Sequence, residues 1–282
     1  MPHLHLHILG SGSKGNCALV EGPRGLIMID NGLSRREVLR RMAELSLKPE
    51  SIAALLLTHE HSDHTKGLKV WCKHWQGPMF ASTGTPAARA DLAELGFEEF
   101  EPGDELELAG VRVRSFSTSH DVVNPVGFRF ECAGDSIGYA TDTGTLLPGA
   151  LELLGDARIL ALESNHDLSM LRCGPYPRYL QDRIASNTGH LSNAQAAEAL
   201  PALVTDRTEH VVAMHISQEN NLPSHAVRAL AGALGAQLDN ELGNAATLAR
   251  EDAATEGGVE AGSGATELHI TPASQVRPLS FL

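Results

Sequence analysis

The stretch THEHSDH, from Thr58 to His64, contains three histidines and two acids within seven residues. It directly follows the apolar run SIAALLL, whose length and composition are typical of a buried β-strand. Imidazole and carboxylate groups are common protein ligands of divalent metals. The stretch therefore predicts a metal-binding loop at the end of a buried strand.

Three further ligand-type residues follow apolar segments later in the chain. His120 comes after VRVRSFSTS, Asp142 after SIGYAT, and His215 at the end of HVVAM. Because loops after strand ends gather at one rim of a sheet, we expect these residues to meet the first group. Taken singly, His120 or His215 would more commonly be a hydrogen-bonded histidine than a ligand.

The number of candidate ligands favours two metals over one. A single catalytic zinc needs three protein ligands and a water. A pair of metals about 3.5 to 4 Å apart needs more ligands and usually a bridging carboxylate. The HxHxDH spacing allows His59 and His61 to face one metal while Asp63 and His64 turn to the other. We therefore expect a dinuclear site.

The composition is that of an ordinary globular protein, and it limits the classes of function. The chain has 282 residues, of which 42% are hydrophobic and 20% charged, so it can bury a large core without a structural metal. Its formal net charge of -13 argues against a broad basic surface for nucleic acid. A nucleic-acid substrate would need a local basic patch or bound metal cations.

Cysteine usage and the N-terminus favour a cytoplasmic protein. Cys17, Cys72, Cys132 and Cys173 form no CxxC pair, so we expect neither a zinc finger nor a disulfide framework. The opening MPHLHLHILG lacks the features of a secretory signal, and no stretch of about 20 apolar residues could span a bilayer. We therefore expect no membrane association.

The segment HLHLHIL alternates histidine with leucine or isoleucine, as a half-buried strand does. His3, His5 and His7 would then share one face. They could form a metal site, but a solvated or hydrogen-bonded face is favoured because ligands seldom all come from one short strand. The following GSGSKGN, from Gly10 to Asn16, predicts a turn and matches no nucleotide-binding motif.

The order of expected elements indicates an α/β (α+β) fold with two sheets between helical layers. Strand patterns dominate the middle of the chain, and helices are expected over residues 35–45, 65–75 and 85–95, from Ser192 and from Ser224. RCGPYPRY, residues 172–179, is interpreted as a loop. The main domain should cover residues 1–234. Residues 235–265 should form a flexible acidic segment rich in alanine and glycine, and residues 266–282 should form a last strand that returns to the domain.

Four motifs resemble, in their order along the chain, the signature of the metallo-β-lactamase-fold superfamily. They are THEHSDH, the SH that ends in His120, TDTG with Asp142 and MHIS with His215. The resemblance spans residues 1–233 and implies a four-layer αββα sandwich. It implies ligands for one metal (His59, His61, His120), ligands for a second metal (Asp63, His64, His215) and a bridge (Asp142). It also implies that Asp30 supports the metal loop without being a ligand.

Two further motifs narrow the choice within the superfamily. LESNHD contains Glu163 and TGHLSNAQAAEA contains His190, and together they resemble the catalytic pair of tRNase Z-like and RNase J-like phosphodiesterases. With GSGSKGN and HISQENN, the set is more similar still to the YycJ/WalJ group, which is regarded as 5′ to 3′ exonucleases. There is no room between Glu163 and His190 for a β-CASP domain, and no long basic arm of the tRNase Z kind is visible.

These features predict a dinuclear metal-dependent phosphodiesterase, expected to be a 5′ to 3′ exonuclease on single-stranded DNA or RNA. Two Zn or Mn ions, or Fe, would activate a water and neutralise the phosphate. Asp63, Glu163 and His190 form the expected catalytic set, in which His190, held charged by Glu163, could protonate the leaving oxygen. The alternative is a glyoxalase II-like thioester or lactone hydrolase, which would share every metal ligand.

The candidates for substrate contact are His166, Arg172, Tyr176 and Arg178. Arginines bind phosphates and aromatic side chains stack on bases in proteins that bind single strands. The same segment could instead be a surface loop with solvated arginines, and His166 could simply hydrogen-bond a loop. A nucleic-acid partner is expected, and a homodimer is left open.

Overall fold

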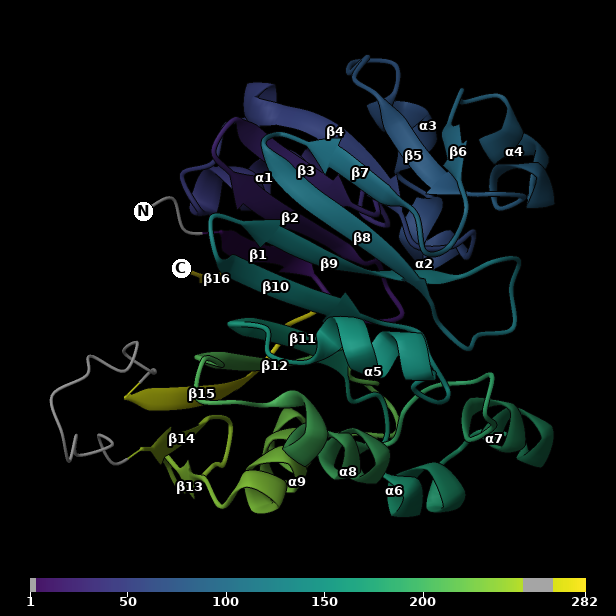
Figure 1. Cartoon of the computed structure of the whole chain (residues 1–282). Coiled ribbons are helices and arrows are strands. Elements are labelled where there is room, and N and C mark those ends of the chain that lie inside the picture. Colours follow the sequence, from purple (N-terminus) through teal and green to yellow (C-terminus); the bar gives the residue numbers. More distant parts are fainter. Residues whose placement is uncertain (1–3, 251–265) are drawn as a thin grey trace, which may run out of the picture.

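The computed structural model describes residues 4–250 and 266–282. They form two large mixed β-sheets packed face to face, with helices on both outer faces (Figure 1). This is the four-layer αββα sandwich that the resemblance implies. Within the described residues, no helix combines the length and apolar character needed to cross a bilayer.

The first sheet has seven strands. Strands β3 to β6 are parallel, whereas β16, β1 and β2 pair in antiparallel fashion. The spatial order is β16 (Leu279–Phe281), β1 (His5–Gly10), β2 (Cys17–Gly22), β3 (Gly25–Ile29), β4 (Ile52–Leu57), β5 (Met79–Ser82) and β6 (Glu98–Phe100).

The second sheet has nine strands. Its centre is parallel from β10 through β11 and β12 to β15, and both flanks are antiparallel. The spatial order is β13 (Gln237–Leu238), β14 (Ala246–Ala249), β15 (Glu267–Pro272), β12 (His210–Met214), β11 (Ile159–Glu163), β10 (Asp135–Ala140), β9 (Val126–Cys132), β8 (Val111–Ser117) and β7 (Glu105–Leu108).

Helices cover the two outer faces. The described chain contains η1 (Pro49–Ser51), η2 (Pro86–Ala88), α1 (Arg35–Glu44), α2 (Ser62–Thr65), α3 (Leu68–Trp71), α4 (Ala90–Ala93), α5 (Pro148–Leu154), α6 (Leu168–Cys173), α7 (Arg178–Ile184), α8 (Asn193–Leu203) and α9 (Pro223–Leu234). Apolar residues of α1, α3 and α4 pack on the first sheet, and those of α5, α8 and α9 pack on the second.

Alternating side chains explain why the central strands are apolar throughout. In β11, Ile159 and Ala161 belong to the core between the sheets, whereas Leu160 and Leu162 pack toward the helices. In β4, Leu56 faces the inner core and Leu57 faces the outer helices. Because successive side chains of a strand point to opposite faces, a strand buried on both faces needs a continuous apolar run. The apolar run of β4 precedes the predicted metal loop, and that of β11 ends at Glu163.

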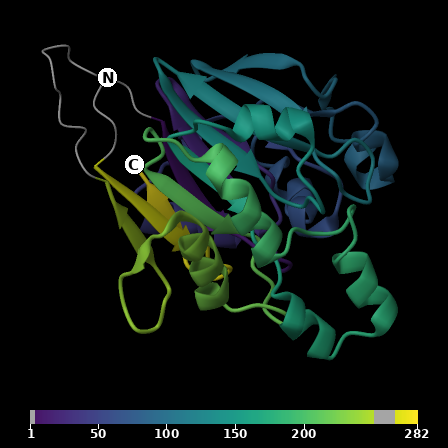
Figure 2. The same ribbon diagram turned by 60° about the horizontal axis from the view of Figure 1, so that its bottom comes forward.

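The C-terminal part of the chain contributes to both sheets. Strand β15 lies between β14 and β12, and β16 pairs with β1, so the strand predicted to return is present as two strands (Figure 2). The prediction of a flexible segment from Gly235 is wrong for residues 237–249, because Ala246 and Leu248 pair with β15 and pack near its apolar face. The rest of that prediction, residues 251–265, lies outside the described residues.

Two local predictions are also wrong, the second in part. The helix expected over residues 85–95 is divided into η2 and α4 at Arg89, which has an extended backbone (φ -139°, ψ 128°). The Arg89 guanidinium donates to the Glu60 carbonyl and to the Thr65 hydroxyl, both at 2.7 Å, so it ties this turn to the predicted metal loop. The loop predicted for RCGPYPRY is confirmed only for residues 174–177, since the segment also contains the end of α6 and the start of α7.

Candidate metal centre

The predicted ligands come from four loops at one end of the sandwich. One loop follows β4 of the first sheet, and the others follow β8, β10 and β12 of the second. Three residues here have left-handed backbones that non-glycine residues rarely adopt: Asp30 (φ 58°), Asp142 (φ 52°) and His215 (φ 52°). Such strained residues cluster at functional sites.

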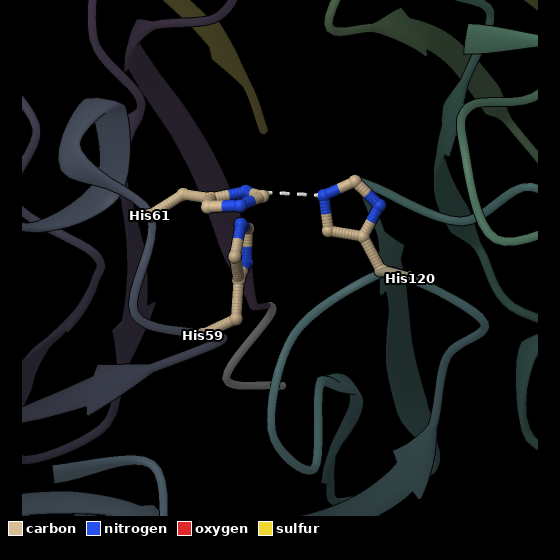
Figure 3. Close-up of side chains that lie close together, drawn as sticks. All are labelled: His59, His61 and His120. Atoms are coloured by element: carbon tan, nitrogen blue, oxygen red, sulfur yellow. Dashed lines mark hydrogen bonds between the residues drawn. The ribbon is translucent and has the colours of Figure 1, made fainter. Parts of the chain in front are cut away.

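His59, His61 and His120 form one group of converging rings (Figure 3). Their candidate ligand atoms all lie within 4.8 Å of one another. The Nε2 atom of His120 lies 3.2 Å from Nδ1 of His61. The other nitrogen of His120, Nδ1, donates to the Gly189 carbonyl at 2.9 Å, so Nε2 is the nitrogen left with a free lone pair.

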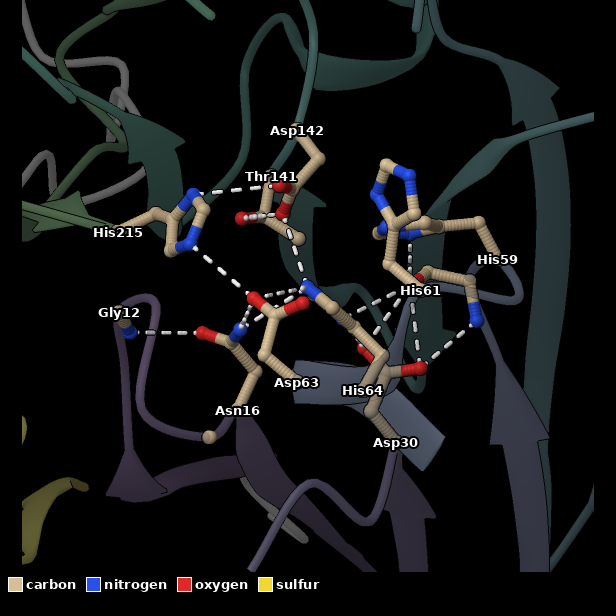
Figure 4. A network of polar contacts seen from close by, with 12 residues as sticks. Gly12, Asn16, Asp30, His59, His61, Asp63, His64, Thr141, Asp142 and His215 are labelled. Carbon is tan, nitrogen blue, oxygen red and sulfur yellow. Dashed lines mark hydrogen bonds and ion pairs between the residues drawn. The ribbon is translucent and has the colours of Figure 1, made fainter. Parts of the chain in front are cut away.

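Asp63, His64 and His215 form the adjoining group, with Asp142 between the two (Figure 4). Nε2 of His64 lies 3.2 Å from Asp142 and 3.5 Å from Asp63. Nε2 of His215 lies 3.6 Å from Asp63, and Asp142 lies 3.9 Å from Nε2 of His120. Asp142 therefore faces both groups, as a bridging carboxylate must.

The histidines are oriented for binding a cation. In four of them Nε2 is turned into the cluster, while Nδ1 contacts another protein group. These Nδ1 contacts are His59 with Thr58, His64 with Asp30, His120 with Gly189 and His215 with Glu163. The buried Nε2 atoms of His59 and His215 have no hydrogen-bond partner. A polar atom buried without a partner is costly, and partners on the far nitrogen are typical of metal-bound histidines. The residues fit a divalent metal.

Charge within the cluster is strongly perturbed. Burial alone would lower the pKa of His64 and raise that of Asp142, but the opposite occurs because the carboxylates and imidazoles face each other. The pKa of His215, despite burial, is raised to about 10 by Asp142, Asp63 and Glu163. Positive charge is thus strongly favoured between these carboxylates, and a divalent cation would supply it while displacing the protons.

Asp30 lies directly behind the predicted metal loop. Its buried carboxylate accepts from the Thr58 amide at 2.8 Å and from the Thr58 hydroxyl at 2.9 Å. It also accepts from Nδ1 of His64 at 2.7 Å. Asp30 therefore orients His64 through the ring nitrogen that faces away from the cluster.

Glu163 contacts both His190 and His215. Its Oε1 accepts from Nδ1 of His190 at 2.8 Å and from Nδ1 of His215 at 3.0 Å. Its Oε2 accepts from the amides of Thr143 and Leu191 at 2.8 and 3.2 Å. Burial would raise the pKa of Glu163, but the neighbouring histidines lower it to about 2, so this carboxylate stays ionised near neutral pH. The sequence indicated the contact with His190 but not the contact with His215.

One side of the cluster is open to solvent. His59, His64, Asp142, Glu163 and His215 are nearly completely buried. By contrast, the side chains of Asp63 and His190 are 21% and 20% exposed, and His61 is partly exposed. A substrate can therefore approach from the side of Asp63, His61 and His190.

Asn16 is a site residue that sequence reasoning missed. Its Nδ2 lies 3.1 Å from the Asp63 carboxylate and 2.9 Å from Nε2 of His64, while its Oδ1 accepts from the Gly12 amide at 2.7 Å. Gly32 permits this approach, because a Cβ atom there would lie 1.6 Å from the Asp63 carbonyl oxygen. The available signal was the asparagine that ends the glycine-rich turn GSGSKGN.

The C-terminal segment holds this glycine-rich turn. Gln275 accepts from the Lys14 amide and donates to the Gly15 carbonyl, both at 2.9 Å. The Ser274 carbonyl accepts from the Ser11 amide at 3.2 Å, and the Ser11 hydroxyl accepts from the His215 amide at 2.7 Å. Residues near the C-terminus therefore position the turn that contacts the metal centre.

Replacing Gln275 with alanine should weaken metal binding without unfolding the protein. Two hydrogen bonds to the turn are lost, each worth about 1 kcal/mol, and outer supports of metal ligands typically affect affinity about tenfold or more. We expect a zinc affinity reduced by about tenfold, measured by competition with a chromophoric chelator. Gln76→Ala, at an exposed glutamine in the segment between α3 and β5, should leave the affinity unchanged. Equal affinities in both variants would contradict the proposed support.

The candidate substrate residues lie on α6, α7 and the segment between them. Arg172 and Arg178 both approach Asp182, at 2.5 and 3.5 Å, and Tyr176 is partly exposed. His166 is 1% exposed and its Nδ1 has no hydrogen-bond partner, and burial lowers its pKa to about 4. Its backbone carbonyl accepts from the Asn193 amide at 2.9 Å, so the backbone rather than the ring holds this loop.

Comparisons with known proteins agree with this geometry. A family model described as a β-lactamase superfamily domain matches residues 26–216. The chain belongs to the metallo-β-lactamase superfamily. It is 35% identical over 225 residues to the exodeoxyribonuclease YycJ of Bacillus anthracis, covering 78% of this chain and 84% of that protein. It is also 35% identical over 242 residues to the exodeoxyribonuclease WalJ of Streptococcus pneumoniae, covering 84% and 90%.

Solved structures agree on the fold of this metallo-β-lactamase-fold protein. The crystal structure of YhfI from Bacillus subtilis, a metallo-β-lactamase fold protein, aligns over 100% of both chains with a TM-score of 0.66 and 12% identity. Family membership and the buried cluster of histidines and aspartates together identify the chain as a hydrolase that depends on divalent metal.

Proposed function

We propose that this hydrolase is a dinuclear phosphodiesterase that degrades single-stranded DNA or RNA from the 5′ end. The observation that carries the proposal is the pair of Glu163 and His190, in contact at 2.8 Å beside the metal centre. His190 is partly exposed on the open side, whereas Glu163 is buried and ionised behind it. The relatives named exodeoxyribonucleases make DNA the first substrate to test.

The two groups of donors support two ions, of Zn, Mn or Fe. His59, His61 and His120 would hold one ion, and Asp63, His64 and His215 the other, with Asp142 as the bridge. When bound, the ions supply a nucleophilic water near neutral pH and neutralise phosphate charge. The donor set of imidazoles and carboxylates suits these metals better than it suits Mg or Ca.

His190 would protonate the leaving oxygen. Because the Glu163 carboxylate accepts from Nδ1 of His190, the ring must present Nε2 to the substrate. The buried Glu163 carboxylate holds the ring from the Nδ1 side, and a proton from Nε2 would neutralise the alkoxide as the P–O bond breaks. Asp63, also on the open side, is the carboxylate available to take a proton from the attacking water.

Helices α6 and α7 are the proposed substrate-binding segment. Arg172 and Arg178 share a single acid, Asp182, and so retain positive charge for a phosphate. Tyr176 and the 76% exposed Tyr179 offer rings on which bases could stack. The ion pair between Arg183 and Asp121, at 2.6 Å, joins α7 to the loop that begins with His120, so this segment borders the metal centre.

The proposal is tested with end-labelled single-stranded DNA and RNA and protein reconstituted with Mn²⁺ or Zn²⁺. We expect metal-dependent release of mononucleotides from the 5′ end, lost in His61→Ala. Products that shorten from the 3′ end would refute the polarity. If fully metallated protein cleaves no nucleic acid but hydrolyses thioesters or lactones, the glyoxalase II-like alternative, which shares the metal ligands, would replace the proposal.

A further inference from the structure

A second group of ligand-type side chains lies outside the metal centre, on strands β1 and β2. His5 and His7 occupy alternate positions of β1 and therefore point to the same face of the sheet. Glu21 of β2 is the direct cross-strand partner of His5. The third side chain thus comes from a different strand, which the sequence pattern of β1 could not reveal.

The three side chains converge on one point. Oε2 of Glu21 lies 3.1 Å from Nδ1 of His5 and 3.2 Å from Nε2 of His7. The candidate ligand atoms of all three lie within 4.8 Å of one another. With metal–ligand bonds of about 2.0 to 2.2 Å, tetrahedral ligands of zinc lie roughly 3.3 Å apart. The spacing therefore suits a metal with little movement of the side chains.

His7 is held in the orientation that a ligand needs. Its Nδ1 lies 2.7 Å from the Ser280 hydroxyl of β16, and the residue is 3% exposed. A hydrogen-bond partner on the far nitrogen fixes the ring and leaves Nε2 for the metal, as is usual for metal-bound histidine. His5 and Glu21 are partly exposed, so water can reach the same point and complete the coordination.

We propose that His5, His7 and Glu21 bind a divalent transition metal of the zinc class, separately from the metal centre. Two imidazole nitrogens and one carboxylate favour Zn²⁺, Co²⁺, Ni²⁺ or Cu²⁺ over Mg²⁺ and Ca²⁺. The bound ion links β1 to β2 and, through Ser280, both strands to β16. The competing explanation is a carboxylate that accepts two hydrogen bonds from imidazoles, with no affinity for metal.

The test is equilibrium dialysis of the tag-free full-length protein against Zn²⁺, with metal content measured by mass spectrometry. Wild type should bind one more equivalent per chain than Glu21→Gln or His5→Ala, and the nuclease assay should be unaffected. The difference is one equivalent whether the metal centre holds one ion or two, so the result does not depend on the proposed function. Both substitutions are at partly exposed positions, and circular dichroism checks that the variants fold.

The matched control is His269→Ala. His269 is also a strand histidine, 41% exposed and 3.5 Å from Glu267, but it belongs to no cluster of three metal-ligating side chains within the described residues. Its substitution should leave the zinc content at the wild-type value. If Glu21→Gln and His5→Ala also retain the wild-type content, the contacts of Glu21 are hydrogen bonds only and the proposal is overturned.

Discussion

Asp142→Asn is expected to abolish hydrolysis, with activity reduced by at least about a thousandfold, and to remove metal from the centre. Asp142 faces His64, His120 and His215 at 3.2, 3.9 and 3.3 Å. The substitution removes the negative charge that faces both groups of ligands. Asparagine has nearly the same shape and tolerates the left-handed backbone (φ 52°) of this position, so the fold should persist.

Metal content and steady-state activity measure this effect. Asp156→Asn is the matched control, because Asp156 has the same backbone conformation (φ 57°) and its carboxylate contacts Thr205 and Arg207 rather than the metal centre. The control should bind metal and hydrolyse substrate like wild type. An Asp142→Asn protein with full metal content and activity would rule out the bridging role.

His190→Ala is expected to reduce hydrolysis of DNA or RNA by roughly 10² to 10⁴-fold, the usual contribution of a general acid, with metal content retained. His190 contacts Glu163 at 2.8 Å and lies 3.6 Å from Asp142. Its candidate ligand atom lies within 4.8 Å of those of Asp142, Glu163 and His215, but its side chain, 20% exposed, is on the open side of the cluster. Its removal leaves a nucleotide alkoxide to depart without a proton.

A substrate with a better leaving group tests whether His190 is a general acid or a positioning residue. The anion of p-nitrophenol is stable without a proton, so bis(p-nitrophenyl) phosphate should be hydrolysed by His190→Ala with a much smaller loss than nucleic acid. His225→Ala, at a 41% exposed histidine on α9, should match wild type on both substrates. An equal loss on both substrates in His190→Ala would show that His190 positions the substrate or the metal instead of donating a proton.

Much of the architecture was predictable because its signals are local. Strand β4 and the last four residues of β12 are continuous apolar runs, and candidate ligands follow each of them. The helix from Ser192 was predictable because Ser192 and Gln195 form a capping box. Local signals failed where a tertiary contact decided the outcome, as at Arg89, whose side chain bonds to Glu60 and Thr65 and interrupts the expected helix.

Contacts between distant strands could not be predicted in the same way. Glu163 reaches His215 because β11 and β12 are parallel neighbours, with Glu163 opposite Met214. Strand β14 has few strand-forming residues, yet it pairs with β15, which lies after residue 265 in the sequence. Asn16 reaches Asp63 and His64 because the turn that contains it is held by Gln275.

The sequence by itself determined the candidate ligands, because spacing along a single strand or loop dictates which side chains emerge together at a strand end. The superfamily and the αββα sandwich followed from the resemblance of these motifs to a known signature. Only the tertiary structure decided that Glu163 also contacts His215 and that Gln275 holds the turn of Asn16. It also gave the atoms through which Asp30 contacts His64. It also brought Glu21 to His5 and His7. These contacts depend on strand order and register, which arise from packing between segments far apart in the chain.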